Sequence, residues 1–337
     1  MIGITVVSSA VAMTVYDSFF PRYERQKYAL GAYDYSMHED TLFREEISFS
    51  SEGVRLSGYY YPVEDARALV VVVHGYRSGA DDFLPLIERI TDSGYAVFSY
   101  DMTATYSSDG DSGIGMCRAL VDLDCALDFL EGEARFSDMP LLLVGHSLGG
   151  YAVASALELH PNVRGCVCLA PMNDASTVMI EMSEEYVGTL LAYSTKPIFD
   201  FYQSVLFGDY VMYNGVRGIN STDVPVLIVQ GITDEVITAD GFSIYAKRDE
   251  ITNPNVEYLL TDGYTGSHTG VWHSEAAMKY AEEVDTELRL LRDKNGGELT
   301  DSQMKEFYDS VDHRLYSEVG EEVFSKMLAL FEKALEN

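Results

Sequence analysis

Positive charge is scarce in this sequence. Its 337 residues include 23 Lys and Arg against 54 Asp and Glu, which gives a formal net charge of −31. A surface of that sign repels phosphate backbones and anionic lipid headgroups, so we expect no nucleic-acid partner. The same imbalance argues against a strongly anionic substrate.

Cysteine is also sparse. The four cysteines are Cys117, Cys125, Cys166 and Cys168, and their spacing contains no C-x-x-C pair that could join a second cluster in a zinc site. Cys166 and Cys168 alternate within an apolar, strand-like run, so we expect both to face the same side of a sheet. We interpret all four as buried, reduced thiols, which favours a reducing, cytoplasmic compartment.

A membrane-spanning run is absent as well. Residues 1–16 carry no charged side chain, but a spanning helix needs about 20 apolar residues. The stretch lacks a basic lead-in and Asp17 follows it directly, so a cleaved signal peptide fits poorly. Three interpretations stay open: a helix packed on the body, a membrane anchor, or the stump of a longer anchor. If the stretch inserts, Arg22, Arg25 and Lys27 favour a cytoplasmic body.

The remaining composition is that of a globular protein, with 47% hydrophobic and 23% charged residues. Residues 47–50 and 54–61 alternate around a Glu-Gly turn and predict an antiparallel hairpin. Six further apolar runs, most of them separated by helical stretches, predict buried parallel strands: 68–73, 95–100, 141–144, 166–170, 226–229 and 256–260. Apolar rather than alternating runs indicate an α/β fold with a parallel sheet covered on both faces.

The most informative segment is residues 141–150. An apolar strand runs directly into Gly145-His146-Ser147-Leu148-Gly149, and a helix rich in small residues follows. This is the G-x-S-x-G motif in the strand–turn–helix context that presents a serine hydroxyl above the edge of the sheet. A Gly-rich turn with an idle serine is the structural alternative. We expect Ser147 to be a nucleophile.

The order of the elements predicts four parts. Residues 1–44 form an apolar segment and lead-in, and residues 45–171 with 223–292 form the core. Residues 172–222 interrupt the strand–helix rhythm and are rich in methionine and aromatic residues, which favours a helical cap over an apolar pocket. Residues 293–337 form a C-terminal extension, whose amphipathic stretch 300–337 we expect to pack on the body.

The chain resembles the α/β-hydrolase superfamily over about residues 45–292. It is similar to the serine-hydrolase branch that includes monoacylglycerol-lipase-like and lysophospholipase-like enzymes and serine aminopeptidases. The resemblance depends on His74-Gly75, on Asp101 with its Gly/Ser loop, on the serine turn, on Gly231-Ile232-Thr233-Asp234 and on a histidine after the last strand. It implies an α/β-hydrolase fold with a mostly parallel sheet, helices on both faces and a cap insertion.

In this superfamily the nucleophile, the acid and the base follow in that order. The resemblance places the acid at Asp234, with Glu235 and Asp240 as substitutes, although a turn aspartate is the structural alternative. It places the base at His268, which lies among small residues before a helix begins near Ser274, while His273 stays open as an alternative. We expect His146 to support the serine turn.

The resemblance also implies an oxyanion hole formed by the backbone N–H groups of Leu148 and Tyr76. The sequence then predicts a serine hydrolase that needs no cofactor and no metal and cleaves carboxylic esters through an acyl-serine intermediate. Medium-chain acyl esters, lysolipids and monoacylglycerols are the substrates that the apolar interval favours. The small-molecule ester is the expected partner, and the sequence leaves the oligomeric state open.

Two other functions remain open at this point. A serine aminopeptidase would need an acidic subsite for a free amine, which Glu181, Glu184 and Glu185 could supply, although a solvated helix face explains them equally well. A non-catalytic binding protein with the same fold is the second. Labelling by a serine-reactive probe would separate this last alternative from both enzymes.

Overall fold

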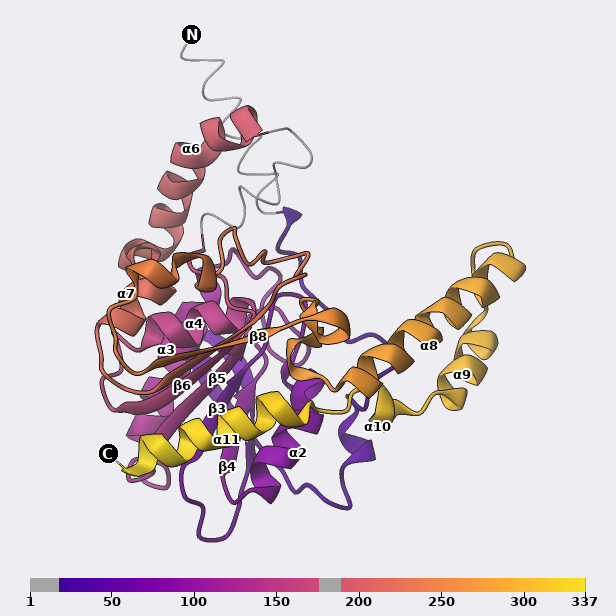
Figure 1. Cartoon of the computed structure of the whole chain (residues 1–337), viewed down its shortest axis with the longest axis horizontal. Coiled ribbons are helices and arrows are strands. Elements are labelled where there is room, and N and C mark those ends of the chain that lie inside the picture. The colour runs from indigo at the N-terminus through magenta and orange to yellow at the C-terminus, as the bar shows by residue number, and fades with distance from the viewer. Residues whose placement is uncertain (1–17, 176–188, 337) are drawn as a thin grey trace.

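The computed structural model describes residues 18–175 and 189–336, and an eight-stranded sheet runs through the body of the molecule (Figure 1). The strand order is β1-β2-β4-β3-β5-β6-β7-β8. The bounds are β1 Glu45–Ser51, β2 Val54–Tyr61, β3 Leu69–Val73, β4 Ala96–Tyr100, β5 Leu141–His146, β6 Val163–Leu169, β7 Val226–Gly231 and β8 Val256–Thr261. Strands β3 to β8 pair in parallel, while β1 and β2 form the predicted antiparallel hairpin.

The order of strands reverses around β3, because the chain passes from β3 to β4 on one side and then to β5 on the other. Ligands of open α/β sheets bind beyond the carboxyl ends of the strands at such a reversal. The carboxyl end of β3 leads into His74-Gly75, and that of β5 leads into Ser147. The topology therefore brings the two predicted segments together.

Helices cover both faces of the sheet, which explains why the inner strands β3 to β7 are mostly apolar. Val71 and Leu143 face a core shared with α3 (Arg118–Gly132) and α4 (Leu148–Ala156). Val70 and Leu142 face the opposite core, which α2 (Leu84–Asp92) and α11 (Glu321–Glu336) complete (Figure 1). This confirms the predicted fold class. Cys166 and Cys168 face the same side, as their alternation predicts, with 3.6 Å between the sulfur atoms.

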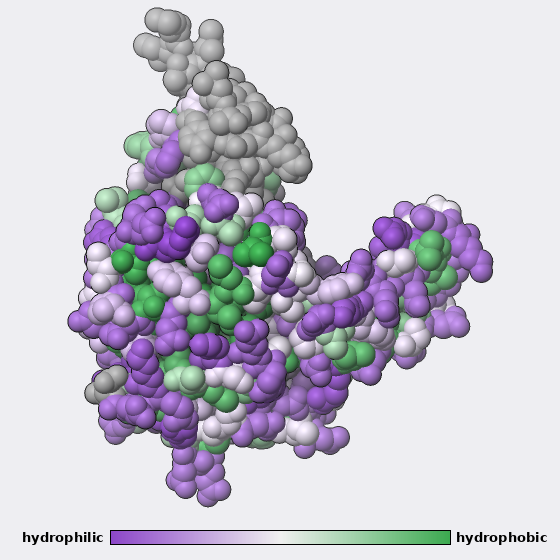
Figure 2. Space-filling view, viewed as in Figure 1, coloured by the Kyte–Doolittle hydropathy of each residue, from purple (hydrophilic) through white to green (hydrophobic). Residues whose placement is uncertain are grey.

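Three helices form an arm that projects from the body, defined here as residues 274–318 (Figure 1). They are α8 (Glu275–Lys294), α9 (Asp301–Ser310) and α10 (His313–Tyr316). Both ends of the arm meet at one point, where His273 bridges Val319 and the N–H of Ser274 donates to the carbonyl of Glu318 at 2.9 Å. Figure 2 shows a hollow between the arm and the body.

The C-terminal stretch packs only in part as the sequence predicts. Helix α11 lies on the sheet, but α9 packs on α8 in a small separate core of Val284, Leu288, Phe307 and Val311. The reason is that α8 offers its own apolar stripe to α9 after the chain has left the body. The predicted domain boundaries stay predictions.

The interval 172–222 contains α6 (Thr189–Phe207) and α7 (Gly215–Asn220). Residues 176–188, which include the cap residues Met179, Met182 and Tyr186 and the three glutamates proposed for an amine subsite, lie outside the described residues. So does the uncharged stretch 1–16. Among residues 18–175 and 189–336, no helix combines the length and the apolar character that a membrane span requires.

Candidate active site

Ser147 lies at the turn between β5 and α4, in a backbone conformation that non-glycine residues rarely adopt. Its φ is 56° and its ψ is −114°, which is strained for a residue with a side chain. The N–H of Ser147 donates to the carbonyl of Leu169 at 2.8 Å, which ties the turn to the end of β6. The turn therefore has the strained geometry of a nucleophile elbow.

The glycines of the motif are required by close backbone contacts. A Cβ atom at Gly145 would lie 2.3 Å from the carbonyl oxygen of Gly149, and one at Gly149 would lie 2.2 Å from that of Val73. At Gly75 a Cβ atom would lie 3.3 Å from the Cβ of Ser147. The loop after β3 thus passes directly beside the serine.

Three side chains from three loops form a hydrogen-bonded chain. His268 Nε2 lies 2.9 Å from Ser147 Oγ, and His268 Nδ1 lies 2.8 Å from Asp234 Oδ2. The other carboxylate oxygen of Asp234 accepts the N–H groups of Val236 and Ile237 at 2.9 and 2.7 Å. All three side chains are buried. The carboxylate is held by its own loop and can fix the orientation of the imidazole.

Of the two neighbouring histidines, the structure brings His268 and not His273 to the serine. His273 Nδ1 lies 2.7 Å from the carbonyl oxygen of Thr269, and burial lowers the pKa of His273 to about 4. The carboxylate beside His268 Nδ1 is that of Asp234. Glu235 instead accepts the backbone N–H of His268 at 3.3 Å.

His146, expected only to support the serine turn, also contacts the loop that carries the base. Its Nε2 lies 3.0 Å from the carbonyl oxygen of His268, and the two rings are 4.9 Å apart. Burial lowers the pKa of His146 to about 3, so the ring is neutral and Nε2 carries the proton that it donates. Its position between two glycines of the motif was the only signal in the sequence.

The two amides predicted for an oxyanion hole, those of Leu148 and Tyr76, both lie beside Ser147. Leu148 is the first residue of α4, where backbone N–H groups have no partner within the helix. Among the described residues, neither amide donates a hydrogen bond. The side chain of Tyr76 is committed elsewhere, since its hydroxyl donates to the carbonyl of Phe19.

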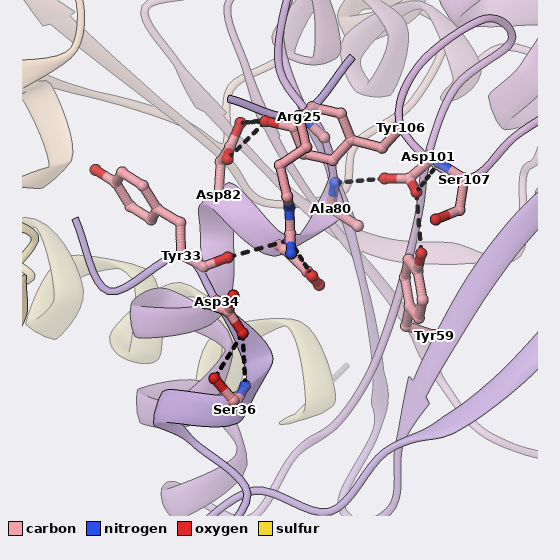
Figure 3. Close-up of polar contacts among 12 residues, drawn as sticks. Arg25, Tyr33, Asp34, Ser36, Tyr59, Ala80, Asp82, Asp101, Tyr106 and Ser107 are labelled. Carbon is pink, nitrogen blue, oxygen red and sulfur yellow. Dashed lines mark hydrogen bonds and ion pairs between the residues drawn. The ribbon is translucent and has the colours of Figure 1, made fainter. Parts of the chain in front are cut away.

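Buried polar groups fasten the loop that carries Tyr76. His74 Nδ1 donates to the carbonyl of Gly75 at 2.8 Å, and its Nε2 accepts the N–H of Met102 at 2.9 Å. Figure 3 shows Asp101 accepting hydrogen bonds from the N–H groups of Ala80 and Ser107 and from the hydroxyl of Tyr59. These contacts join the ends of β3 and β4 beneath the site, which is a positioning role.

Ser147 opens into a cavity of about 270 Å³. Its wall includes His268 and aromatic rings of Tyr33, Tyr76, Phe83 and Trp272. A smaller apolar cavity of about 50 Å³ adjoins the amides of Tyr76 and Leu148 and is lined by Phe20, Met102 and Ala119 among others. The arrangement places a nucleophile, a base and hydrogen-bond donors side by side at one cavity.

One group of residues outside the site has the composition of a metal site: Asp128, Glu131 and His160. Both ring nitrogens of His160 are already engaged, by Asp124 at 2.9 Å and by Glu131 at 3.0 Å. Despite its burial, these two carboxylates raise the pKa of His160, which favours a protonated ring. A metal ion would need the neutral form, so we interpret the group as an ion-pair cluster.

A family model described as "Serine aminopeptidase, S33" matches residues 64–198. Among solved structures, the fold is similar to that of the esterase Pf2001 of Pyrococcus furiosus, with a TM-score of 0.55 and 18% identity. That comparison covers 81% of this chain and 98% of the esterase.

Similarity to curated proteins extends over part of the chain. An uncharacterized protein of Salmonella typhimurium, YfhR, is 27% identical over 70% of this chain and 80% of its own length. Protein phosphatase methylesterase 1 of Candida albicans is 22% identical over 46% of this chain and 43% of its own length. Methylesterase 3 of Arabidopsis thaliana is 31% identical over 29% of this chain and 36% of its own length.

Fold, order of motifs and comparisons agree. The chain has the α/β-hydrolase fold, and over residues 64–198 it is similar to the serine aminopeptidase family. The family model and the named esterases and methylesterases to which it is similar all describe hydrolases.

Proposed function

We propose that this protein is a serine hydrolase that cleaves carboxylic esters. The observation that carries the proposal is the hydrogen-bonded chain from Ser147 Oγ through His268 to Asp234. A serine hydroxyl is a weak nucleophile, and it needs a base within hydrogen-bond distance and a group that orients the base. Esterases and methylesterases among the similar proteins support the choice of ester over other bonds.

In the first half of the reaction, Ser147 Oγ attacks the ester carbonyl carbon while His268 Nε2 takes the hydroxyl proton. The backbone N–H groups of Leu148 and Tyr76 hold the negative oxygen of the tetrahedral intermediate. The carbon–oxygen bond to the alcohol then breaks, and His268 gives the proton to the departing oxygen. The product of this half is an acyl-serine and a free alcohol.

In the second half, water takes the place of the alcohol. His268 accepts a proton from the water as it attacks the acyl-serine, and then returns a proton to Ser147 Oγ. Asp234 stabilises the imidazolium that forms in both halves and stays ionised. No metal or cofactor is required for any step.

The acyl group is best accommodated by the apolar cavity beside Tyr76 and Leu148. Its volume of about 50 Å³ favours a short acyl chain. The preference for medium-chain acyl esters, lysolipids or monoacylglycerols that the sequence suggests depends on the interval 172–222, part of which lies outside the described residues. We therefore propose short acyl esters as the first substrates to test.

The test is the hydrolysis of p-nitrophenyl esters from acetate to decanoate by the wild-type protein and by Ser147→Ala. We expect the highest kcat/KM at short chains and a loss of at least about 10³-fold in the variant. Circular dichroism of the variant checks that it folds. If the wild-type protein hydrolyses none of these esters, the proposal is wrong.

A second candidate is a peptidase that removes amino-terminal residues, favoured by the match to the serine aminopeptidase model over residues 64–198. The same three side chains would then cleave an amide. Aminoacyl p-nitroanilides measured beside the p-nitrophenyl esters separate the two candidates. A higher kcat/KM for the anilides would favour the peptidase.

A further inference from the structure

A second cavity of about 490 Å³ adjoins the active-site cavity. Four residues line both spaces: Tyr33, Asp82, Thr269 and His273. The outer walls come from the lead-in segment, through Tyr23 and Tyr28, and from the arm, through Asp285 and Tyr316. The two cavities thus form one groove that leads from Ser147 to the space between the lead-in and the arm.

Asp82 is the charged group where the two cavities meet, and it has no cationic partner among the described residues. Its carboxylate accepts the hydroxyl of Tyr106 at 3.0 Å, the hydroxyl of Ser78 at 2.6 Å and the N–H of Gly79 at 3.0 Å. These donors are neutral. The carboxylate is therefore fixed in position, and none of the ion pairs of the described residues includes it.

Two arginines lie near this carboxylate and pair with other groups. Arg77, which lines the active-site cavity with Asp82, lies over the ring of Tyr76 at 5.2 Å. Arg25 forms an ion pair with Asp81 and donates to the carbonyl of Tyr33 at 3.1 Å. Figure 3 shows its guanidinium turned away from Asp82, while the hydroxyl of Tyr106 points at that carboxylate. Asp81 also forms an ion pair with Arg44 at 2.8 Å. Arg25 is thus part of an ion-pair cluster with Asp81 and Arg44 that does not include Asp82.

Aromatic rings complete the groove. Five tyrosines line the second cavity: Tyr23, Tyr28, Tyr33, Tyr106 and Tyr316. The faces of aromatic rings attract cations, and rings grouped with a carboxylate recognise ammonium groups. Arg25 already lies over the ring of Tyr106 and Lys27 over that of Tyr28, which leaves Tyr23, Tyr33 and Tyr316 for a ligand. Among the described residues that line this cavity, the cationic side chain is that of Arg292, on the exposed part of α8. The net charge of −31 would steer a cationic ligand toward the protein.

The groove lies on the side of the departing alcohol. His268 gives its proton to that alcohol, so the alcohol must lie beside His268. Thr269 and His273, from the same loop, line both parts of the groove. The apolar cavity beside Tyr76 and Leu148 has no lining residue from this loop, which assigns it to the acyl group.

We propose that Asp82 and the surrounding tyrosine rings bind a cationic ammonium group on the alcohol part of the substrate. The preferred substrates are then short-chain esters of amino alcohols, which the enzyme converts with one water into the carboxylic acid and the amino alcohol. This inference rests on the ester hydrolysis proposed above and names the substrate class for it.

The experiment compares acetylcholine with 3,3-dimethylbutyl acetate, an ester of the same shape in which a neutral carbon replaces the nitrogen. For the wild-type protein we expect kcat/KM to be at least about tenfold higher for acetylcholine. In Asp82→Asn this preference should fall to near one. Asp109→Asn is the matched control, because it removes the same charge from an exposed pair with Arg55.

The outcomes separate the inference from the function on which it rests. Equal hydrolysis of the two esters by the wild-type protein, or an equal loss for both in Asp82→Asn, overturns the amine subsite and leaves the esterase intact. Hydrolysis of p-nitrophenyl acetate without either alkyl ester also overturns the subsite. Inactivity on every ester, p-nitrophenyl acetate included, removes the proposed function itself.

Asp82 also caps the turn at residues 80–83, so a second measurement uses only the wild-type protein. Choline and 3,3-dimethylbutan-1-ol are compared as inhibitors of p-nitrophenyl acetate hydrolysis. We expect choline to compete at a concentration at least about tenfold lower. Equal inhibition constants would contradict the subsite whatever the stability of the Asp82 variant.

Discussion

At the scale of single residues, the proposed reaction requires that each group near Ser147 is held in position. Asp234 is fixed by two backbone N–H groups, and His268 is fixed at Nδ1 by Asp234 and at its carbonyl by His146. Asp234 contacts the imidazole ring of His268, whereas His146 contacts the backbone carbonyl of His268. Variants of the two residues therefore test two different ways of positioning the base.

Asp234→Asn should lower kcat for p-nitrophenyl acetate by about 10³- to 10⁴-fold with little change in KM. An amide favours the wrong tautomer of His268 and cannot stabilise the imidazolium. Asp240→Asn, an exposed residue of the same loop, is the control and should keep wild-type activity. A large loss in the control with normal activity in Asp234→Asn would assign the acid to Asp240.

His146→Phe should lower kcat by about 10- to 100-fold, because His268 loses the donor to its carbonyl and shifts from its position. His146→Gln keeps an N–H donor and should recover part of the activity. Steady-state kinetics separate this positioning role from a general loss of folded protein, which circular dichroism measures. Equal activity of the Phe and Gln variants would contradict the role.

At the scale of elements, the parallel sheet, the hairpin and the turn at Ser147 were predictable because each has a local signal. Apolar runs identify β3 to β7, and the glycines of the elbow are demanded by contacts of 2.2 and 2.3 Å. The packing of the C-terminal helices was not predictable. Both α9 and α11 carry an apolar stripe, and only the tertiary structure decides that α9 meets α8 and α11 meets the sheet.

Part of the site could not be predicted from the sequence, because its residues meet only in the tertiary structure. The residues of the groove come from the lead-in, the loop after β3, the histidine loop and the arm. No spacing along the chain relates Tyr33 or Asp82 to His273. The motifs did predict Ser147, Asp234 and His268, which the structure brings together within hydrogen-bond distance.

The different packing of α11 and α9 leads to a prediction on stability. Phe331→Ala, in the core between α11 and the sheet, should lower the free energy of unfolding by about 3–5 kcal/mol. Phe307→Ala lies in the separate core of the arm and should mainly loosen α8 and α9. Urea denaturation measures the first effect, and hydrogen exchange of the arm measures the second.

One result would contradict the separation of the arm's core from the core under α11. If Phe307→Ala lowered the stability of the sheet as much as Phe331→Ala, the arm would belong to the same cooperative unit as the body. Faster exchange confined to residues 275–316 would support the division.

At the scale of the whole molecule, buried neutral histidines should make stability depend on pH. Burial lowers the pKa of His146 to about 3 and that of His273 to about 4, against about 6.5 in the unfolded chain. Between these values the unfolded state binds protons that the folded state does not, so stability falls as the pH falls below about 6.5. Each histidine should cost about 2 kcal/mol at pH 5.

Urea denaturation at pH 8, 6.5 and 5 measures this loss, and His273→Gln is the comparison. The variant should lose less stability between pH 8 and pH 5 than the wild-type protein, whatever its stability at pH 8. An identical loss in both proteins would mean that His273 titrates alike in the folded and unfolded states.

If the fold activates the hydroxyl of Ser147, a serine-directed fluorophosphonate should react with that residue. Intact-mass spectrometry after incubation should give one adduct per chain, and peptide mapping should place it on Ser147. His268→Ala should react far more slowly, although it keeps the serine. A wild-type protein that stays unlabelled, or one labelled at another residue, would contradict the account.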